Sequence, residues 1–414
     1  MEGKKMGRTY MSLAMLLVAG FMLLAAGCSK QKKEEKPAEP EKPAITEYKI
    51  GAILSVSGPA SFLGDPEKKT LDMLVEKLNA DGGINGVPVK LIVEDDEGKE
   101  EKTKLAASKL VDMDQVLAVI GPSLSGNSMA IKDMMEEKQT TLVSCAAAEA
   151  IVNPVAKWVF KTPQKDSFVA EHILKYMQEN GVAKIAVLYS NDGFGQQGLK
   201  QIKDTMAKYN VEVIMEETYT KESTEDDIAT ILTKVKSNKS VQAIINWTIL
   251  PLQSVVPKKM KELQMDKIKL FHSHGFGNIK YVQNAGDAAN GIIFPAGRLL
   301  VAEELPEDNP QKAGLMSYKQ QYEERFGEDV STFGGHAYDA FWIIVKAIEK
   351  AGADKAAIRD AIETMSGFAG TGGIFNMTAE DHNGLGLDSI EMLTVKDGKF
   401  ALLVPPAAAA PAEQ

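Results

Sequence analysis

Residues 48–79 read YKIGAILSVSGPASFLGDPEKKTLDMLVEKLN, and this order of apolar run, small polar loop and amphipathic stretch decides the fold. Residues 50–55 have the continuous apolar character of a buried strand, and residues 66–79 place apolar side chains at helical spacing. The loop between them is rich in serine, glycine and proline. The segment predicts a strand that passes through a polar loop into a helix, as in a parallel α/β sheet.

This strand–loop–helix unit recurs along the chain. We expect further strands at residues 89–94, 117–120, 141–144, 184–189, 211–216, 241–247 and 269–271. We expect helices at residues 101–111, 127–138, 166–180, 195–209, 226–236, 252–263, 311–326 and 335–351. The two successive runs predict an α/β fold with two doubly wound lobes built on parallel sheets. Ligands of such sheets bind beyond the carboxyl ends of the strands, so a cleft between the lobes is the expected site.

The first 28 residues have the order of an export signal. Lys4, Lys5 and Arg8 precede an apolar run over residues 11–26, and Cys28 follows small residues. A cysteine in this place resembles the bacterial lipobox, in which the preceding peptide is removed and the cysteine carries lipid, although alanine stands where the lipobox usually has leucine. The run is shorter than the roughly 20 apolar residues of a membrane-spanning helix. We expect a signal peptide at residues 1–27 and an exported lipoprotein that begins at Cys28; the alternative is an ordinary signal peptide with an incidental cysteine.

Composition restricts the remaining possibilities. With Cys28 lipidated, only Cys145 is left, so an internal disulfide is excluded. The formal charge of −10 argues against nucleic acid as a partner, because phosphates require a basic surface. Residues 30–43 are charged or polar apart from proline and alanine, so we expect a disordered tether at residues 28–45. We also expect a disordered tail at residues 405–414.

Two loops in the first half favour anion binding. Residues 55–65 and residues 121–128 each join an expected strand to an expected helix with serine, glycine and proline. Such a loop offers hydroxyls and unpaired backbone N–H groups at the positive end of a helix, which suits a carboxylate or a phosphate. The alternative is that these are ordinary helix caps, since serine and asparagine are preferred there for that reason alone.

Three patterns suggest other chemistry and are disfavoured. Residues 193–198 match the dinucleotide fingerprint G-x-G-x-x-G, but residues 190–192 separate the glycines from the expected strand. The histidines at 272 and 274 share one face of a strand, but no nearby cysteine completes a tetrahedral metal site. Residues 121–125 lack the last glycine of the hydrolase elbow G-x-S-x-G. We therefore expect no cofactor, metal or catalytic site, and we regard His274 as a polar ring at a strand end that faces the cleft.

Several short stretches together resemble a known family, the type I solute-binding proteins of ABC importers, and specifically their leucine/isoleucine/valine receptor branch. They lie in this order and spacing: YKIGA (48–52), SGP (57–59) with GD (64–65), DGGING (81–86), VIGP (119–122), FKT (160–162), DGFG (192–195), AYDA (337–340) and DHNGL (381–385). The resemblance extends from about Tyr48 to Leu403.

The resemblance implies a fold of two Rossmann-like lobes joined by three crossover strands, near Thr162, Pro295 and Gly372. It also implies that the late helices return to the first lobe. Lobe 1 would comprise residues 46–162 and 296–372, and lobe 2 would comprise residues 163–295 and 373–404. The lobes would close over a ligand by a hinge motion, and a membrane permease would recognise the closed form.

The resemblance also assigns site residues. Ser125 occupies the place of a serine that holds the ligand carboxylate, and the Ala146 N–H group that of a backbone donor. Ala148 stands where the family has a threonine, and His274 where it has an acidic residue that pairs with the ligand ammonium. A neutral histidine only accepts a hydrogen bond from an ammonium, and a protonated one repels it. The two changes argue against an ordinary α-amino acid.

The expected ligand is a small carboxylate with an apolar or aromatic body. Its apolar wall would be built by Phe62, Leu63 and Trp247, with Ser144 and Phe333 as further candidates. We expect a monomeric, non-enzymatic receptor that is anchored outside the cytoplasm through Cys28 and serves an ABC permease. The alternatives are a branched-chain amino acid receptor with a rearranged site, a chemosensory or signalling receptor of the same fold, and an exported enzyme.

Overall fold

The computed structural model describes residues 45–403. The expected signal peptide, Cys28, almost all of the tether and the tail at residues 405–414 lie outside the described residues. Among residues 45–403, no helix has the length and apolarity that a bilayer-spanning segment requires.

The described chain alternates strands and helices. The strands are β1 (Tyr48–Leu54), β2 (Val89–Asp95), β3 (Ala118–Ile120), β4 (Thr141–Ser144), β5 (Val159–Lys161), β6 (Lys184–Ser190), β7 (Glu212–Tyr219), β8 (Ala243–Trp247), β9 (Lys269–His272), β10 (Ile293–Ala296), β11 (Ser366–Ala369), β12 (Ile374–Asn376), β13 (Glu391–Lys396) and β14 (Lys399–Leu402). The α-helices are α1 (Ser61–Ala80), α2 (Glu100–Ser108), α3 (Ser125–Glu137), α4 (Asp166–Glu179), α5 (Gly193–Met206), α6 (Glu225–Ser237), α7 (Val255–Glu262), α8 (Ile279–Ala285), α9 (Lys312–Phe326), α10 (Thr332–Ala351) and α11 (Lys355–Glu363). The short turns used below are η5 (His274–Phe276), a 3₁₀ turn, and η7 (Arg298–Glu304).

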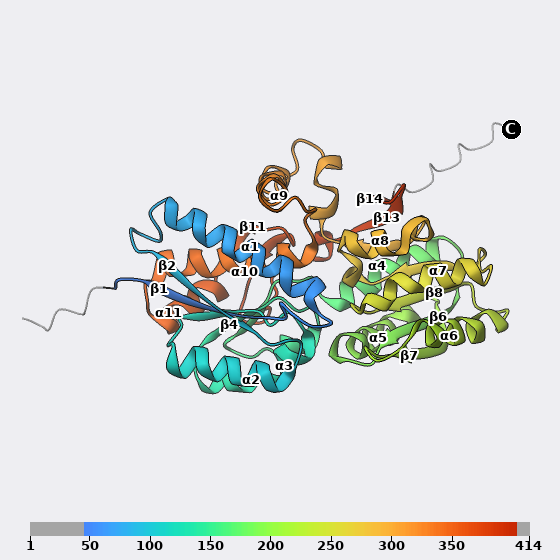
Figure 1. The fold of residues 1–414 in the computed structure, drawn as a ribbon, viewed down its shortest axis with the longest axis horizontal. Helices are drawn as coiled ribbons and strands as arrows, with labels where there is room; N and C mark the ends of the chain where they lie inside the picture. The colour runs from blue at the N-terminus through green and yellow to red at the C-terminus, as the bar shows by residue number, and fades with distance from the viewer. Residues whose placement is uncertain (1–44, 404–414) are drawn as a thin grey trace, which may run out of the picture. The chain divides into compact units, whose positions relative to one another are not determined.

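Most strands form two large sheets, each at the centre of one lobe, and β11 and β12 form a small antiparallel sheet of their own. The first sheet has the order β2-β1-β3-β4-β5, and all its pairs are parallel. The second has the order β14-β13-β10-β9-β8-β6-β7 and is parallel except for β13, which is antiparallel to both of its neighbours. The expected α/β fold with two doubly wound lobes is therefore confirmed (Figure 1).

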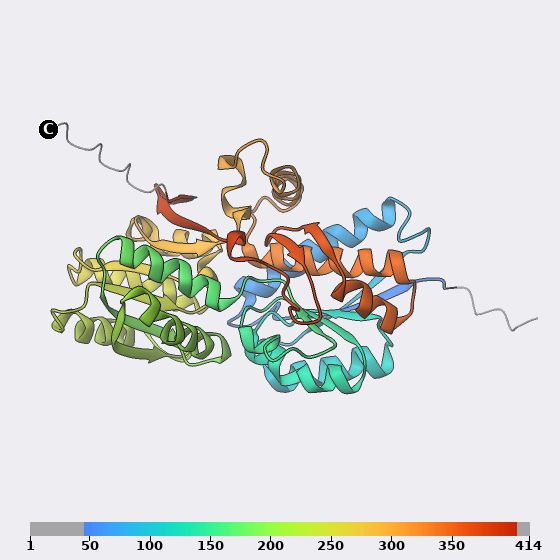
Figure 2. The ribbon, with the colours of Figure 1, turned by 180° about the vertical axis from the view of Figure 1, so that it is seen from behind.

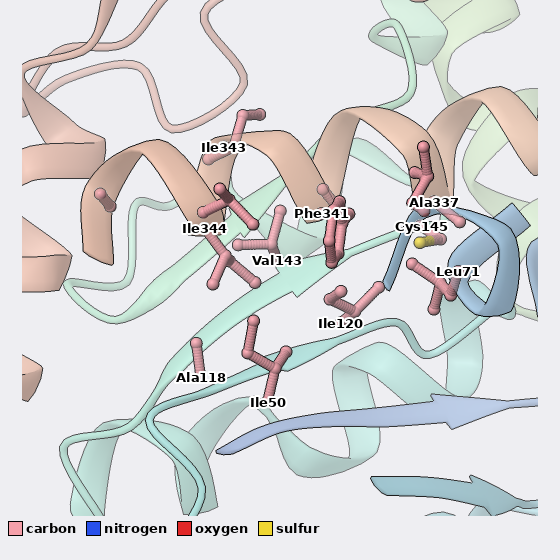
Figure 3. Packing of buried hydrophobic residues seen from close by; sticks show 14 of the residues in the cluster. Ile50, Leu71, Ala118, Ile120, Val143, Cys145, Ala337, Phe341, Ile343 and Ile344 are labelled. Atoms are coloured by element: carbon pink, nitrogen blue, oxygen red, sulfur yellow. The ribbon is translucent and has the colours of Figure 1, made fainter. Parts of the chain in front are cut away.

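Side-chain alternation on the strands builds a core on each face of the first sheet. Ile50 and Leu54 of β1 face α1 and α10, whereas Ile53 faces the layer of α2 and α3. Figure 3 shows the first of these cores, with strand residues packed against Phe341 and Ile344 of α10. Helix α10 lies beside α1, although more than 250 residues separate them (Figure 2).

The chain passes between the two sheets three times within residues 45–403. It leaves the first sheet after β5, returns after β10 through η7 to α9, α10 and α11, and enters the second sheet again at β13. Met377 and Leu385 still pack in the core of the first lobe, so the last passage follows Leu385 rather than residue 372.

Several helices begin earlier than we expected from the sequence, and α3 and α1 are the two that bear on the cleft. Helix α3 starts at Ser125, so this serine is the first helical residue. Helix α1 starts at Ser61 and contains Pro66, which has no N–H to donate to the carbonyl of Phe62. The side chain of Asn278, from the second lobe, donates to that carbonyl instead, with Nδ2 and O 3.1 Å apart. The proline therefore frees an acceptor for a contact between the lobes.

Candidate functional site

A cavity of about 350 Å³ lies between the two lobes, and we call it the outer cavity. Residues of both lobes line it, which places it where the family resemblance implies a ligand. From the first lobe they are Pro59, Ala60, Glu97, Gly98, Glu100, Leu124, Ser125, Gly126 and Asn127, and from the second they are Asn191, Asp192, Gly193, Phe194, Thr220, Lys221, Glu222, Ile249 and Leu250.

A second, smaller space of about 30 Å³ adjoins the outer cavity, and we call it the inner chamber. The two share Leu124, Ser125, Phe194 and Ile249 in their walls. The other lining residues are Leu63, Ser123, Cys145, Ala146, Ala147, Pro163, His274, Gly275, Phe333 and His336. A volume of this size holds one or two water-sized groups.

Most of the lining residues follow the carboxyl ends of parallel strands. Ser125 follows β3, Cys145 follows β4, Phe194 follows β6, Ile249 follows β8 and His274 follows β9. Because parallel strands end at one edge of their sheet, these residues converge there. The expected location of the site beyond the strand ends agrees with the position of both spaces.

The start of α3 opens into both spaces and carries unused hydrogen-bond donors. Its N-cap is Leu124, which offers no side-chain acceptor. Within residues 45–403, the N–H groups of Ser125, Gly126 and Asn127 have no hydrogen-bond partner. The Ser125 hydroxyl accepts from the Ala148 N–H at 3.2 Å, so its own proton remains available. This helix end can receive an anion.

The start of α5, which carries the G-x-G-x-x-G pattern, is already capped. The Asp192 carboxylate accepts hydrogen bonds from the N–H groups of Phe194 at 3.0 Å and Gly195 at 2.8 Å. A Cβ atom at Gly198 would lie 2.1 Å from Nε1 of Trp247. The pattern is thus explained by an N-cap and by close packing of a helix on a strand.

Four ionisable side chains are buried beside the inner chamber, namely those of His274, His336, Lys161 and Asp166. Lys161 donates to the carbonyls of Ala147, Pro163 and Gln164 at 2.5, 3.1 and 3.0 Å, and burial lowers its pKa to about 8. Asp166 is fully buried, and neither of its carboxyl oxygens has a hydrogen-bond partner among the described residues.

Burial raises the pKa of Asp166 to about 8, although the nearby Lys161 ammonium acts in the opposite direction. Oδ1 of Asp166 lies 3.7 Å from Nε2 of His274. Burial, assisted by Lys161, holds the pKa of His274 well below its ordinary value and lowers that of His336 to about 3. Both rings are therefore neutral near pH 7.

The structure brings five of the nine residues expected in the site to the inner chamber, namely Leu63, Ser125, Ala146, His274 and Phe333. Ala148 lies just behind them and donates to Ser125. Ser144 is fully buried, and its hydroxyl accepts the Ala146 N–H at 3.1 Å. The Ala146 N–H group that we expected to contact the carboxylate is thus already paired.

Two expected wall residues lie elsewhere, and their positions are corrected. Trp247 is fully buried and lies behind the wall, with its ring 6.0 Å from that of Phe194 and 6.1 Å from that of His274. Phe62 stacks on Tyr281 of the second lobe at 5.1 Å and lines neither space.

The sequence analysis missed Phe194, Ile249, Cys145 and His336 as lining residues. The first three follow strand ends, so the strand-end rule would have found them. His336 lies inside α10. It reaches the site only because α10 packs against the strands of the first sheet.

Carboxylates outnumber lysines in the wall of the outer cavity. Glu97 is paired with Lys99 at 2.8 Å and with Lys102, and Asp192 caps α5. Glu100 stands close to the start of α3, because a Cβ atom at Gly126 would lie 3.1 Å from its Oε1. The Glu100 carboxylate is thus close enough to repel an anion, or to attract a cation, that is bound at the start of α3.

The described part of the chain offers no group of three or more histidine, cysteine or acidic side chains that is arranged to hold a metal ion. His272, which we weighed as a metal ligand, has its Nδ1 3.1 Å from Oε1 of Gln253. The ring is fully buried, and its Nε2 has no hydrogen-bond partner among the described residues.

Comparisons with known proteins agree with this architecture. The sequence profile of the family described as "Periplasmic binding protein" matches residues 47–399. A "Leucine-, isoleucine-, valine-, threonine-, and alanine-binding protein" of Pseudomonas aeruginosa is 26% identical over 322 residues, which are 77% of this chain and 83% of the relative.

The fold of this chain is also similar to the folds of solved structures. An extracellular ligand-binding receptor from Rhodopseudomonas palustris HaA2 is similar with a TM-score of 0.79 and 28% identity over 86% of this chain and 99% of its own. A solute-binding protein of an ABC transporter from Rhodopseudomonas palustris BisB5, in complex with 3,4-dihydroxybenzoic acid, shares the fold with a TM-score of 0.73 and 18% identity over 86% of this chain and 95% of its own. Since the family profile spans most of the sequence, this chain belongs to the periplasmic binding protein family, with the type I fold, and is a binding protein rather than an enzyme.

Proposed function

We propose that the protein is the extracytoplasmic solute-binding component of an ABC importer and that it captures a small carboxylate with an apolar or aromatic body. The observation that carries this proposal is the start of α3 in the cleft between the lobes, where the Ser125 hydroxyl and three N–H groups have a proton that no described residue accepts. An anion is the group that such a helix end binds best.

The expected interaction energies are large enough for specific binding of a carboxylate in the cleft. A hydrogen bond to a charged group contributes about 1.5–3 kcal/mol, and a favourable helix–charge contact up to about 2 kcal/mol when partly buried. The ligand body would contact Leu124, Phe194, Ile249 and Leu250, which supply the apolar part of the outer cavity. Several such contacts together account for capture of a dilute solute.

The related proteins support a ligand of this class. The Pseudomonas aeruginosa relative is named for binding mostly aliphatic amino acids, and the structure from Rhodopseudomonas palustris BisB5 holds an aromatic acid. Both kinds of compound combine a carboxylate with an apolar or aromatic body.

A branched-chain amino acid in a rearranged site is the second candidate. It is favoured by Glu100 near the start of α3, since its carboxylate supplies the negative partner that an ammonium requires. The response of binding to removal of the Glu100 charge, described in the Discussion, distinguishes the two candidates.

We further propose that lipid on Cys28 anchors the mature, monomeric protein outside the cytoplasm, where the closed form meets a permease. The test is to express the wild-type protein and a Cys28→Ala variant in the presence of a labelled fatty acid. We expect the label to be incorporated into the wild-type protein and to be absent from the variant. Equal labelling of both proteins would contradict the anchor.

The carboxylate site is tested by calorimetry on the wild-type protein and a Ser125→Ala variant. The ligand is chosen from amino acids, aliphatic acids and aromatic acids by the shift of the thermal unfolding temperature, because a ligand at a hundredfold its Kd adds about 2.7 kcal/mol of stability. We expect Ser125→Ala to lose about 1.5–3 kcal/mol of binding free energy, and the control Ser317→Ala, an exposed position of α9, to lose none. A loss below about 0.5 kcal/mol for Ser125→Ala would remove this residue from the site.

A further inference from the structure

We infer that the inner chamber is a subsite for one neutral hydroxyl group of the ligand, held between His274 and His336, with Asp166 as the positioning residue behind His274. This inference rests on the proposed carboxylate-binding function and narrows its ligand to hydroxylated carboxylic acids.

The first observation is that the two lobes each present an unsatisfied histidine to the same small space. His274 comes from η5 of the second lobe and His336 from α10 of the first, and each side chain is only 6% exposed. Neither ring nitrogen of His274, nor Nδ1 of His336, has a partner among the described residues. Buried polar atoms without partners cost free energy, so a group that pairs with them on closure is favoured.

The second observation is the size of the chamber. Its volume of about 30 Å³ is that of one or two water-sized groups, whereas the adjoining outer cavity of about 350 Å³ has room for a ligand body. A carboxylate at the start of α3, a body in the outer cavity and a small polar tip in the chamber use all three parts of the site.

The chemistry of the chamber selects a neutral tip. Each neutral imidazole offers one N–H donor and one acceptor, and a hydroxyl group both donates and accepts, so it matches a pair of such rings. An ammonium only donates and would be repelled by the buried Lys161 ammonium. A carboxylate only accepts, and the three protons of Lys161 are already donated to backbone carbonyls, so this nearby cation has no proton left for it.

Asp166 acts on the ligand through His274. It does not line the chamber, and its Oδ1 lies 3.7 Å from Nε2 of His274. This separation is beyond hydrogen-bond distance, so Asp166 acts through space on the Nε2 side of the ring and leaves Nδ1 for the ligand. Edge contacts of the ring with Phe194 and Trp247 fix its plane.

The test measures the affinity of matched acids by calorimetry. The probes are benzoate with 3- and 4-hydroxybenzoate, and hexanoate with 6-hydroxyhexanoate. We expect at least one hydroxylated acid to bind tenfold or more tightly than its parent, since a site built for a hydroxyl leaves polar groups unpaired when the hydroxyl is missing. A ratio below twofold in every set would overturn the subsite while leaving the carboxylate proposal intact. If none of the acids binds, the carboxylate proposal and the subsite both fail.

Variants separate a role in recognition from a role in folding. We expect His336→Leu to reduce the ratio of hydroxylated to parent affinity to below twofold, and His336→Gln, which keeps a donor and an acceptor, to retain part of the ratio. Asp166→Asn should lower the same ratio at least threefold. A defect of folding would instead weaken both acids of a set equally, and an unchanged ratio in His336→Leu would contradict the inference.

Discussion

Asp166 and Lys161 show how individual residues near the hinge are held in unusual states. Lys161 is buried but satisfied, because three carbonyl groups accept its protons. Asp166 is buried without a hydrogen bond to any residue in the range 45–403, which favours its neutral form. The burial of this carboxyl group makes the stability of the protein depend on pH.

We first predict how the free energy of unfolding depends on pH through Asp166. The pKa of Asp166 rises from an ordinary value of 3.8 to about 8 in the folded protein, so its contribution to stability is fully present below the unfolded pKa and is lost as pH rises toward 8. The free energy of unfolding of the wild type, relative to Asp166→Asn, should fall between pH 5 and 7.5 by at most about 1.4 kcal/mol per pH unit, the value for one proton. Urea unfolding at several pH values measures it, and a constant difference between the two proteins would contradict it.

Glu100 carries the second prediction at this scale. Its exposed carboxylate stands close to the start of α3, where we propose that the ligand carboxylate binds. Glu100→Gln should therefore tighten the binding of a simple carboxylate about two- to fivefold at low salt, with a smaller effect at high salt. Glu137→Gln, at the other end of α3, serves as the control and should change nothing. Weaker binding by Glu100→Gln would instead favour a ligand with an ammonium group.

At the scale of elements, helix α5 illustrates a helix whose position depends on one missing side chain. Gly198 lets α5 approach β8 so closely that its backbone lies against the Trp247 ring. In an exposed helix, Gly→Ala stabilises by about 1 kcal/mol, but overpacking a core costs about 1–3 kcal/mol. The two effects change the free energy of unfolding in opposite directions. The sign of the change in a Gly198→Ala variant therefore shows whether the packing of α5 against Trp247 dominates.

We therefore predict that Gly198→Ala lowers the free energy of unfolding by about 1–3 kcal/mol. The matched change is Gly314→Ala in α9, where nothing lies within 4 Å of the added Cβ atom, and it should raise the free energy by up to about 1 kcal/mol. Denaturant unfolding of both variants measures the difference. A stabilising Gly198→Ala would show that α5 is free to move away from β8.

The longer elements were predictable because their patterns are local. Buried strands such as β1 and β8 are continuous apolar runs, and the helices next to them repeat apolar residues at helical spacing. The strands β5 and β12 were not found from this pattern, because each is short and lacks a longer apolar run such as VLAVI (116–120), which marked the equally short β3. The antiparallel pair β13–β14 has a mixed burial pattern that resembles an exposed loop.

The strand ends account for part of the site that was predictable, and the family resemblance accounts for Phe333, which comes from helix α10. Ser125 and His274 follow parallel strands and lie where the rule places them. Trp247 has the same parity on β8 as Ala243 and Ile245, so it faces the layer of α4 and α5 rather than the cleft. His336 reaches the chamber from a helix that is distant in sequence, which no local pattern reveals.

At the scale of the whole molecule, the contacts between the lobes describe a closed cleft. Phe62 and Asn278 meet on one side through a hydrogen bond, and the Gly277 carbonyl accepts the Thr332 N–H at 3.0 Å. Near the outer cavity, Gly193 of α5 lies against Gly126 of α3, so the starts of two helices from different lobes touch. Ligand binding and closure are linked if the ligand prefers this form.

The contact at Gly193 gives the fourth prediction. A Cβ atom there would lie 2.9 Å from the backbone nitrogen of Gly126, which belongs to a helix and cannot move aside alone. Gly193→Ala should hinder closure by about 1–3 kcal/mol and weaken ligand binding roughly 5- to 150-fold. Calorimetry measures the affinity, and Gly314→Ala is the control. Unchanged affinity in Gly193→Ala would mean that the ligand does not require this closed form.

The most direct test of the central claim is a crystal structure of the protein with the carboxylate that gives the largest thermal shift. We expect closed lobes with a carboxylate oxygen within hydrogen-bond distance of the Ser125 hydroxyl and of the N–H groups at the start of α3. A ligand whose carboxylate lies away from α3, or one bound outside the cleft between the lobes, would contradict it.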